Sequence, residues 1–141
     1  MQKKYARVSA EQILSGLGLV QIYQSLCAAD GVEAKALKPA DITEQALANA
    51  NDYAVRSLQL FCRVLGSFGG NLALNVKALG GVYIAGGIVP RFIEYVKQSE
   101  FRARFDAKGR FGKLIETIPV YVVTEEQPGL IGCAAYLQQE I

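Results

Sequence analysis

The segment at residues 80–91 most constrains the fold, because it joins an apolar run to two adjacent glycines and then to a proline. Residues 82–85 are uncharged, and the first three are branched or aromatic, which predicts a parallel strand buried on both faces. Gly86 and Gly87 then let the chain turn sharply, and Pro90 suits the first turn of a helix. A strand, a glycine turn and a helix are typical of ligand sites in open α/β sheets, although a tight turn that binds nothing has the same pattern.

The composition predicts a folded protein and excludes several kinds of site. The 141 residues are 51% hydrophobic, which is enough apolar surface for a core within one domain. The 15 Lys and Arg residues nearly balance the 13 Asp and Glu residues, and a formal net charge of +2 gives no electrostatic case for a nucleic acid or membrane partner. The chain has no histidine, so we expect neither a Ser-His triad nor a zinc site within it.

The cysteines and the N-terminal residues indicate the compartment. Cys27, Cys62 and Cys133 are odd in number and far apart, which predicts reduced thiols that are mostly small core residues. The charged residues 1–4 are not followed by an apolar stretch long enough for a signal peptide or a membrane span. We therefore expect a soluble cytoplasmic protein.

Two helices are predicted near the start of the chain. Apolar residues at three- and four-residue spacings predict a helix over 9–29 with Ser9 as its N-cap, which places Glu11 in the first helical turn. After a loop, a short helix is predicted with Asp41 or Thr43 as its cap.

A long helix is predicted over 52–78. Gly66, Gly69 and Gly70 weaken it by up to about 1 kcal/mol each relative to alanine. We therefore expect a neighbouring backbone or helix to approach closely at these glycines. The predicted buried stripe consists of Val55, Leu58, Phe61, Cys62, Leu65, Phe68, Leu72 and Val76.

The second half of the chain holds a further strand. Helices over 91–98 and 100–107 and a short segment over 111–116 lead to a buried strand at 118–123, and a helix over 130–139 closes the chain. The two strands form a right-handed βαβ unit on general grounds, but their apolar runs need neighbours that this chain does not supply. We therefore expect the later part of a larger α/β domain. Small residues that suit close packing lie along the closing helix, namely Gly129, Gly132, Ala134 and Ala135.

Six segments spread over the chain carry the motifs of one known family. They are V-S-A-E-Q-I-L-S-G-L-G-L-V at 8–20, F-G-G-N-L-A-L-N at 68–75, G-G-V-Y-I-A-G-G-I-V-P-R-F at 80–92, F-R-A-R-F at 101–105, K-G-R-F at 108–111, and I-P-V-Y with P-G-L-I-G within 118–132. Together they resemble the C-terminal portion of bacterial glucokinases, from about Val8 to Gln138. The resemblance implies part of a ribonuclease-H-like domain of the actin-like ATPase fold, helix-rich with a few buried strands.

The resemblance also implies roles for four residues. Glu11 matches a glutamate that accepts hydrogen bonds from glucose hydroxyls, since one carboxylate can accept from two sugar O–H groups. Without the resemblance, Glu11 reads as a first-turn glutamate favoured by the helix dipole. Gly86 and Gly87 match the adenosine motif, where a turn without side chains makes room for base and ribose, and Ile88 lines that pocket. The family usually has a proline where this chain has Leu17, which frees one φ angle of that turn.

Other parts of the family's site precede the matched region. They are the aspartate that takes the proton from the sugar hydroxyl, the two phosphate loops, the metal-directing aspartate and a Glu-His pair that holds glucose. We therefore expect no catalytic residue and no metal ligand in these 141 residues, with Mg²⁺ held elsewhere, and no useful rate from the chain alone. The expected reaction is transfer of phosphate from ATP to glucose, giving glucose 6-phosphate at the entry to glycolysis.

Two other functions remain open from the sequence. The chain could be a non-catalytic nucleotide- or sugar-binding module, although no DNA-binding segment supports a repressor. It could also be an assembly partner, with the helix over 61–79 as a dimer interface. Family members resemble homodimers, and unpaired sheet edges disfavour a monomer. The expected partners are therefore a second copy or the missing N-terminal half, besides glucose and ATP.

Overall fold

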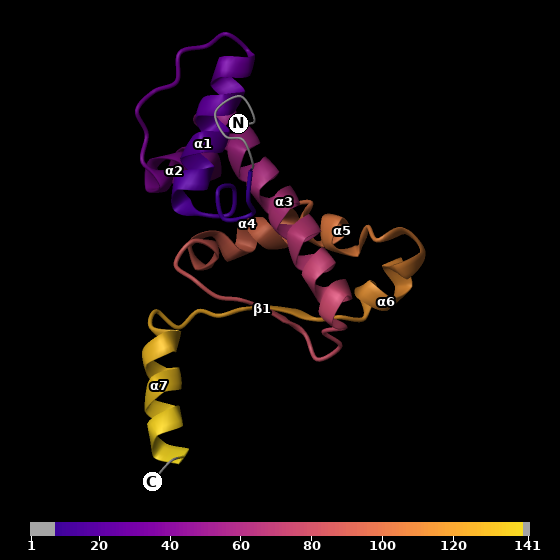
Figure 1. Cartoon of the computed structure of the whole chain (residues 1–141). Helices are drawn as coiled ribbons and strands as arrows, with labels where there is room; N and C mark the ends of the chain where they lie inside the picture. The colour runs from indigo at the N-terminus through magenta and orange to yellow at the C-terminus, as the bar shows by residue number, and fades with distance from the viewer. Residues whose placement is uncertain (1–7, 140–141) are drawn as a thin grey trace.

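A long helix, α3 (Asp52–Val76), crosses the middle of the structure, and α1, α2 and α5 pack against it (Figure 1). The structure is a computed structural model that describes residues 8–139. Its elements confirm the predicted helix-rich α/β class. The other helices are α1 (Gly16–Ala29), α2 (Pro39–Leu47), α4 (Ile93–Gln98), α5 (Phe101–Asp106), α6 (Gly112–Glu116) and α7 (Pro128–Gln139), with 3-10 turns η1 (Val89–Phe92) and η2 (Gly109–Phe111) and strands β1 (Val82–Ile84) and β2 (Val120–Val122).

The first helix begins later than the sequence predicts. Ser9 caps only a single separate turn, where its backbone N–H donates to Oε1 of Gln12 at 2.8 Å. Ser15 then caps α1, because its Oγ accepts from the Gly18 N–H at 3.0 Å. The carbonyl of Ile13 lies so close to Gly18 that a Cβ there would clash. The chain therefore folds back on the start of α1, which is incompatible with one continuous helix.

The cap of α2 also differs from the predicted Asp41 or Thr43. Lys38 holds the N-cap position, and its N–H donates to Oδ2 of Asp41 in the first helical turn at 2.8 Å. Thr43 instead donates through Oγ1 to the carbonyl of Pro39 at 3.0 Å. Because the fixed φ of Pro39 fits the first helical position, the helix begins ahead of both predicted caps.

The predicted long helix is confirmed, but its buried stripe is correct only in the N-terminal half. There Leu58, Phe61 and Cys62 are at most 2% exposed, where α1 and α2 pack on α3. Farther along, the predicted stripe has no neighbour among residues 8–139 that buries it. Val55 and Leu65 are half-buried, whereas Phe68, Leu72 and Val76 are 39%, 46% and 72% exposed.

The C-terminal half of α3 buries its glycine face instead. A Cβ on Gly66 would clash with the carbonyl oxygen of Phe101, and one on Gly70 with that of Phe105. Both carbonyls belong to α5, so the backbones of the two helices meet without intervening side chains. This contact confirms the predicted close approach at the glycines.

The two strands pair in parallel, as predicted, but they are not buried on both faces. Val82 pairs with Val120 and Ile84 with Val122, and the side chains of these four residues pack against the core. The opposite face of the pair carries Tyr83, which is 66% exposed, and Tyr121, which is 45% exposed. Their rings stack with centroids 4.9 Å apart. The prediction fails on this face because no described element covers it.

The closing helix α7 extends away from the rest of the structure (Figure 1) and has no buried residue. Nothing lies within 4 Å of a Cβ placed at Gly129 or Gly132, so the predicted close packing does not occur within residues 8–139. Cys133 on this helix is exposed, whereas Cys27 and Cys62 are buried as predicted, and burial raises the pKa of the Cys62 thiol to about 11. No helix in the described part of the chain is long and apolar enough to span a membrane.

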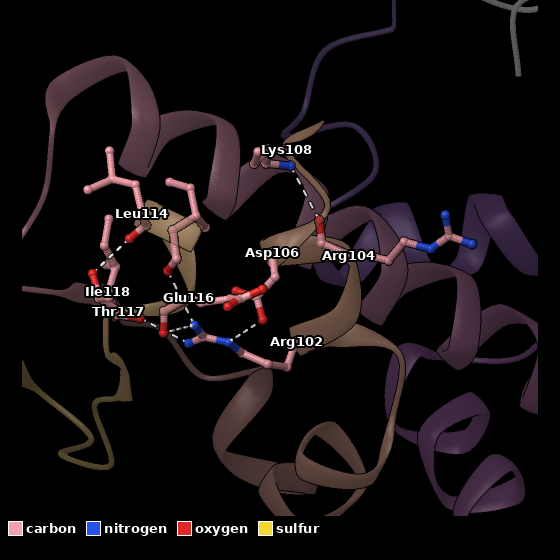
Figure 2. A network of polar contacts seen from close by, with 9 residues as sticks. Arg102, Arg104, Asp106, Lys108, Leu114, Glu116, Thr117 and Ile118 are labelled. Carbon is pink, nitrogen blue, oxygen red and sulfur yellow. Dashed lines mark hydrogen bonds and ion pairs between the residues drawn. The ribbon is translucent and has the colours of Figure 1, made fainter. Parts of the chain in front are cut away.

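Arg102 on α5 makes hydrogen bonds along its own helix and to residues 13 to 16 positions farther along the chain (Figure 2). Its Nε donates to Oδ2 of Asp106 at 2.8 Å, and its terminal nitrogens donate to the carbonyls of Glu116 at 2.8 Å and Ile118 at 2.9 Å. A guanidinium suits the carbonyls at a helix C-terminus because they are partly negative and lack helical partners. Arg102 therefore holds the end of α6 and the approach to β2 against α5.

We predict that Gly66→Ala destabilises the protein, because its Cβ would collide with the Phe101 carbonyl. The expected loss in free energy of unfolding is about 2 kcal/mol or more. Gly69→Ala is the matched control, since its Cβ would lie at an ordinary 3.5 Å from the Phe105 ring. The control should gain up to about 1 kcal/mol from helix propensity. Urea denaturation measures both, and equal stabilities would contradict the described contact.

We predict that Arg102→Ala lowers the free energy of unfolding by about 1 to 3 kcal/mol, because the charged hydrogen bonds to the Glu116 and Ile118 carbonyls are lost. Arg104→Ala is the control on the same helix. Within residues 8–139, the Arg104 side chain pairs with exposed Glu100, and removing it should cost no more than about 0.5 kcal/mol. Chemical denaturation of the two variants checks this difference.

Candidate functional site

A cavity of about 500 Å³ lies where β1 and β2 end. Because the strands are parallel, the segments that follow their carboxyl ends meet at one edge of the sheet. The volume of the cavity falls in the range of small-molecule sites. The cavity is lined by Gly86, Gly87, Pro90, Arg91, Thr124, Glu125, Glu126 and Pro128.

The two glycines that the sequence singles out form the β1 side of this cavity. Gly86 has a φ of +121°, a conformation that side-chain-bearing residues rarely adopt. Within residues 8–139, no atom beyond the two adjacent residues lies within 4 Å of a Cβ placed at Gly86 or at Gly87, so the described side chains leave the corner open. A flat ligand can therefore contact the backbone at this corner directly.

Ile88 occupies a different place from the two glycines. Its side chain is half-buried and packs against the core, and it does not line the cavity. The next residues form η1, in which Val89 and Phe92 are buried at 5% and 4% exposure. The helix predicted from residue 91 is thus a 3-10 turn followed by α4, and it anchors the corner to the core.

Glu11 lies in the separate turn before α1, so the prediction of a place in the first helical turn is wrong. Its side chain is exposed and makes no hydrogen bond or ion pair within residues 8–139. The structure does not bring Glu11 to the cavity beside Gly86 and Gly87. Leu17, where the resemblance has proline, is the second residue of α1, a position that tolerates proline.

Sequence reasoning missed the charged lining of the cavity. From the sequence, Arg91 is expected to begin a helix and residues 124–127 to form a polar connection. The available signal was the parallel pairing itself, since residues just after one strand must lie beside those just after the other. The cavity therefore combines one guanidinium with the carboxylates of Glu125 and Glu126.

The carboxylates at the cavity are not arranged as a metal site. Oε1 of Glu125 accepts from the Gln127 N–H at 3.2 Å, which holds the connection in a local turn. Within residues 8–139, no group of three or more His, Cys, Asp or Glu side chains could hold a metal ion. The lining offers carboxylate oxygens as acceptors and the Arg91 guanidinium as a donor.

Comparison with known proteins identifies the family. The glucokinase family model matches residues 1–140. The chain belongs to the glucokinase family. The glucokinase of Pectobacterium atrosepticum is 54% identical over 139 residues, and that of Tolumonas auensis is 52% identical over 141 residues.

The solved structures include a similar fold. A crystal structure of glucokinase from an Antarctic psychrotroph matches 98% of this chain with a TM-score of 0.89 and 38% sequence identity. The match covers 43% of that glucokinase chain, and this chain spans 43% and 44% of the two bacterial relatives. The resemblance to glucokinases noted from the sequence is thereby confirmed.

Proposed function

We propose that this chain is the C-terminal portion of a glucokinase, which transfers phosphate from ATP to glucose to give ADP and glucose 6-phosphate. The observation that carries the proposal is the open corner at Gly86 and Gly87, at the strand ends of a chain that belongs to the glucokinase family. Like the relatives it matches, the enzyme is expected to contain further sequence. We place its fold with the ribonuclease-H-like, actin-like ATPases and its activity in the cytoplasm.

In this proposal the corner binds the adenosine part of ATP. Gly86 supplies the left-handed turn, and Gly87 leaves space in which base and ribose approach the backbone. Ile88 contributes by packing against the core beneath the turn, which keeps the corner rigid. Such preorganisation favours binding because little conformational entropy is lost when the ligand arrives.

Glu11 is proposed to bind glucose. Its carboxylate is exposed and has no partner among residues 8–139, so it is free to accept two sugar hydroxyls. The turn that carries it is held at both ends, by the Ser9 and Gln12 hydrogen bonds and by the Ser15 cap of α1. A sugar contact at Glu11 and a nucleotide at the Gly86 corner would then occupy separate places on this chain.

The 141 residues alone are proposed to be inactive. Phosphoryl transfer depends on neutralising the charge that develops on the phosphates, which Mg²⁺ and phosphate-loop amides supply. The carboxylates of this chain are not grouped for a metal ion, within residues 8–139, so we place the Mg²⁺ ligands elsewhere in the enzyme. No catalytic residue is assigned to this chain.

The rest of the enzyme is the proposed partner of the exposed apolar surfaces. Tyr83 and Tyr121 leave one face of the strand pair open, and α7 exposes Leu130 and Tyr136 at 65% and 61%. Packing of the preceding portion on the strands, and of α7 across the hinge between two lobes, would bury these groups. We propose a homodimer as the complete assembly, with no nucleic acid or membrane partner.

Self-association is the second candidate function, and one observation favours it. Phe68, Leu72 and Val76 recur at four-residue spacing on α3, and all three are exposed. Since Gly66 and Gly70 bury the other side against α5, this stripe is available to a second copy. If the chain serves only in assembly, the reconstituted mixture described next would form neither ADP nor glucose 6-phosphate when ATP and glucose are added.

We predict that the chain regains activity when it is combined with the preceding portion of the Pectobacterium atrosepticum glucokinase. Glucose-dependent ADP formation should appear in the mixture, while either part alone stays below about a thousandth of that rate. A coupled assay for glucose 6-phosphate measures the rate of the mixture and the rate of each part alone. Glu11→Gln should reduce the rate, because one sugar acceptor is weakened. A folded mixture that forms no sugar phosphate would contradict the kinase proposal.

We predict that Gly87→Val weakens ATP binding by about tenfold or more, because the new side chain would occupy the cavity without straining the backbone. Gly80→Val is the control, since that position is also open but lies outside the cavity. Calorimetric titration of ATP into the reconstituted pair measures the affinity. Equal ATP affinities for the two variants would exclude this corner as the nucleotide site.

A further inference from the structure

Arg91 lines the nucleotide cavity, but its side chain is not engaged by the acids around it. The backbone N–H of Arg91 donates to the Ile88 carbonyl at 3.2 Å, and the flanking Val89 and Phe92 are buried. Within residues 8–139, its guanidinium makes no ion pair, although Glu125 and Glu126 line the same cavity. Arg91 also lines a second hollow together with Glu44, which forms no ion pair with it within residues 8–139. The backbone of Arg91 is thus held by the core, while the guanidinium has unused donors within residues 8–139.

The charges around the cavity determine which part of a nucleotide can lie there. Two carboxylates and one guanidinium give the lining a net negative charge, which disfavours a polyphosphate because like charges repel. The neutral adenosine part has no such penalty, and a volume of about 500 Å³ accommodates it. The phosphates are therefore expected to leave the cavity toward the rest of the enzyme.

We infer that Arg91 is a nucleotide-binding residue that stacks its guanidinium plane on the adenine base. This inference rests on the proposed function, because it assumes that the Gly86 corner binds ATP. A planar guanidinium stacks on an aromatic face, whereas the ammonium of lysine is a point charge without a plane. The two glycines let one side of the adenosine part contact the backbone, and Arg91 stacks on the face of the base.

Arg91→Ala tests this with adenosine, ADP and ATP titrated separately into the chain combined with the preceding portion of the Pectobacterium atrosepticum glucokinase. All three affinities should fall by the same factor, about fivefold, because only the contact with the base is lost. Arg91→Lys should lose nearly as much, since it keeps the charge but not the plane. Arg110→Ala is the control, because Arg110 lies over Phe111 outside the cavity. It should leave all three affinities unchanged.

Three outcomes would overturn the inference. If Arg91→Ala weakens ATP and ADP but not adenosine, the residue contacts phosphate and not the base. If it changes none of the three affinities while Gly87→Val still weakens ATP, Arg91 is only a solvated side chain and the proposed function survives. If the unsubstituted pair binds none of the three ligands, the inference and the proposed nucleotide site fall together.

Discussion

The contact between the backbones of α3 and α5 is the constraint on which the rest of the structure depends. Because Gly66 and Gly70 have no side chains, the carbonyls of Phe101 and Phe105 come directly against α3. Lys108 covers the end of this contact by donating to the carbonyl of Ser67 at 3.1 Å and, as Figure 2 shows, to that of Arg104. Desolvation at this place lowers the pKa of Lys108. The position of α5 is thus set by main-chain atoms.

The position of α5 in turn sets the second strand and the cavity. Arg102 projects from α5 to the carbonyls of Glu116 and Ile118, just before β2 begins. The Val82 N–H then donates to the Pro119 carbonyl at 2.9 Å, which starts the parallel pair. The strand ends meet, and the glycine corner faces the acidic connection. Contacts through Arg102 therefore connect the crossing of α3 and α5 to the candidate cavity.

The sequence predicted those parts of the fold that local chemistry decides. Glycines inside a helix are costly, so their presence in α3 correctly indicated a close neighbour. The apolar runs predicted both strands, but alternation alone could not show that Tyr83 and Tyr121 lie on an uncovered face. Likewise, the spacing of Phe68 and Leu72 predicts that they share an apolar face of α3, but it does not predict which element buries that face. Local periodicity carries no information about missing neighbours.

The candidate site was predictable only in its backbone part. Two adjacent glycines after a strand indicate an open corner in any sequence, and Gly86 has the positive φ that such a corner requires. Arg91 and Glu126 line the same cavity because two strands that are far apart in the chain pair with each other. The spacing of residues in the sequence does not predict that these two side chains lie close together. The roles of Glu11 and Ile88 rest on the family alone.

The thiols of this chain differ sharply in their access to solvent, which has a practical consequence. Cys27 and Cys62 lie in the core, while Cys133 stands on the projecting α7. A maleimide reagent will therefore attach a fluorophore at that single position without any cysteine substitution. A fluorophore at Cys133 would report any change in the surroundings of α7.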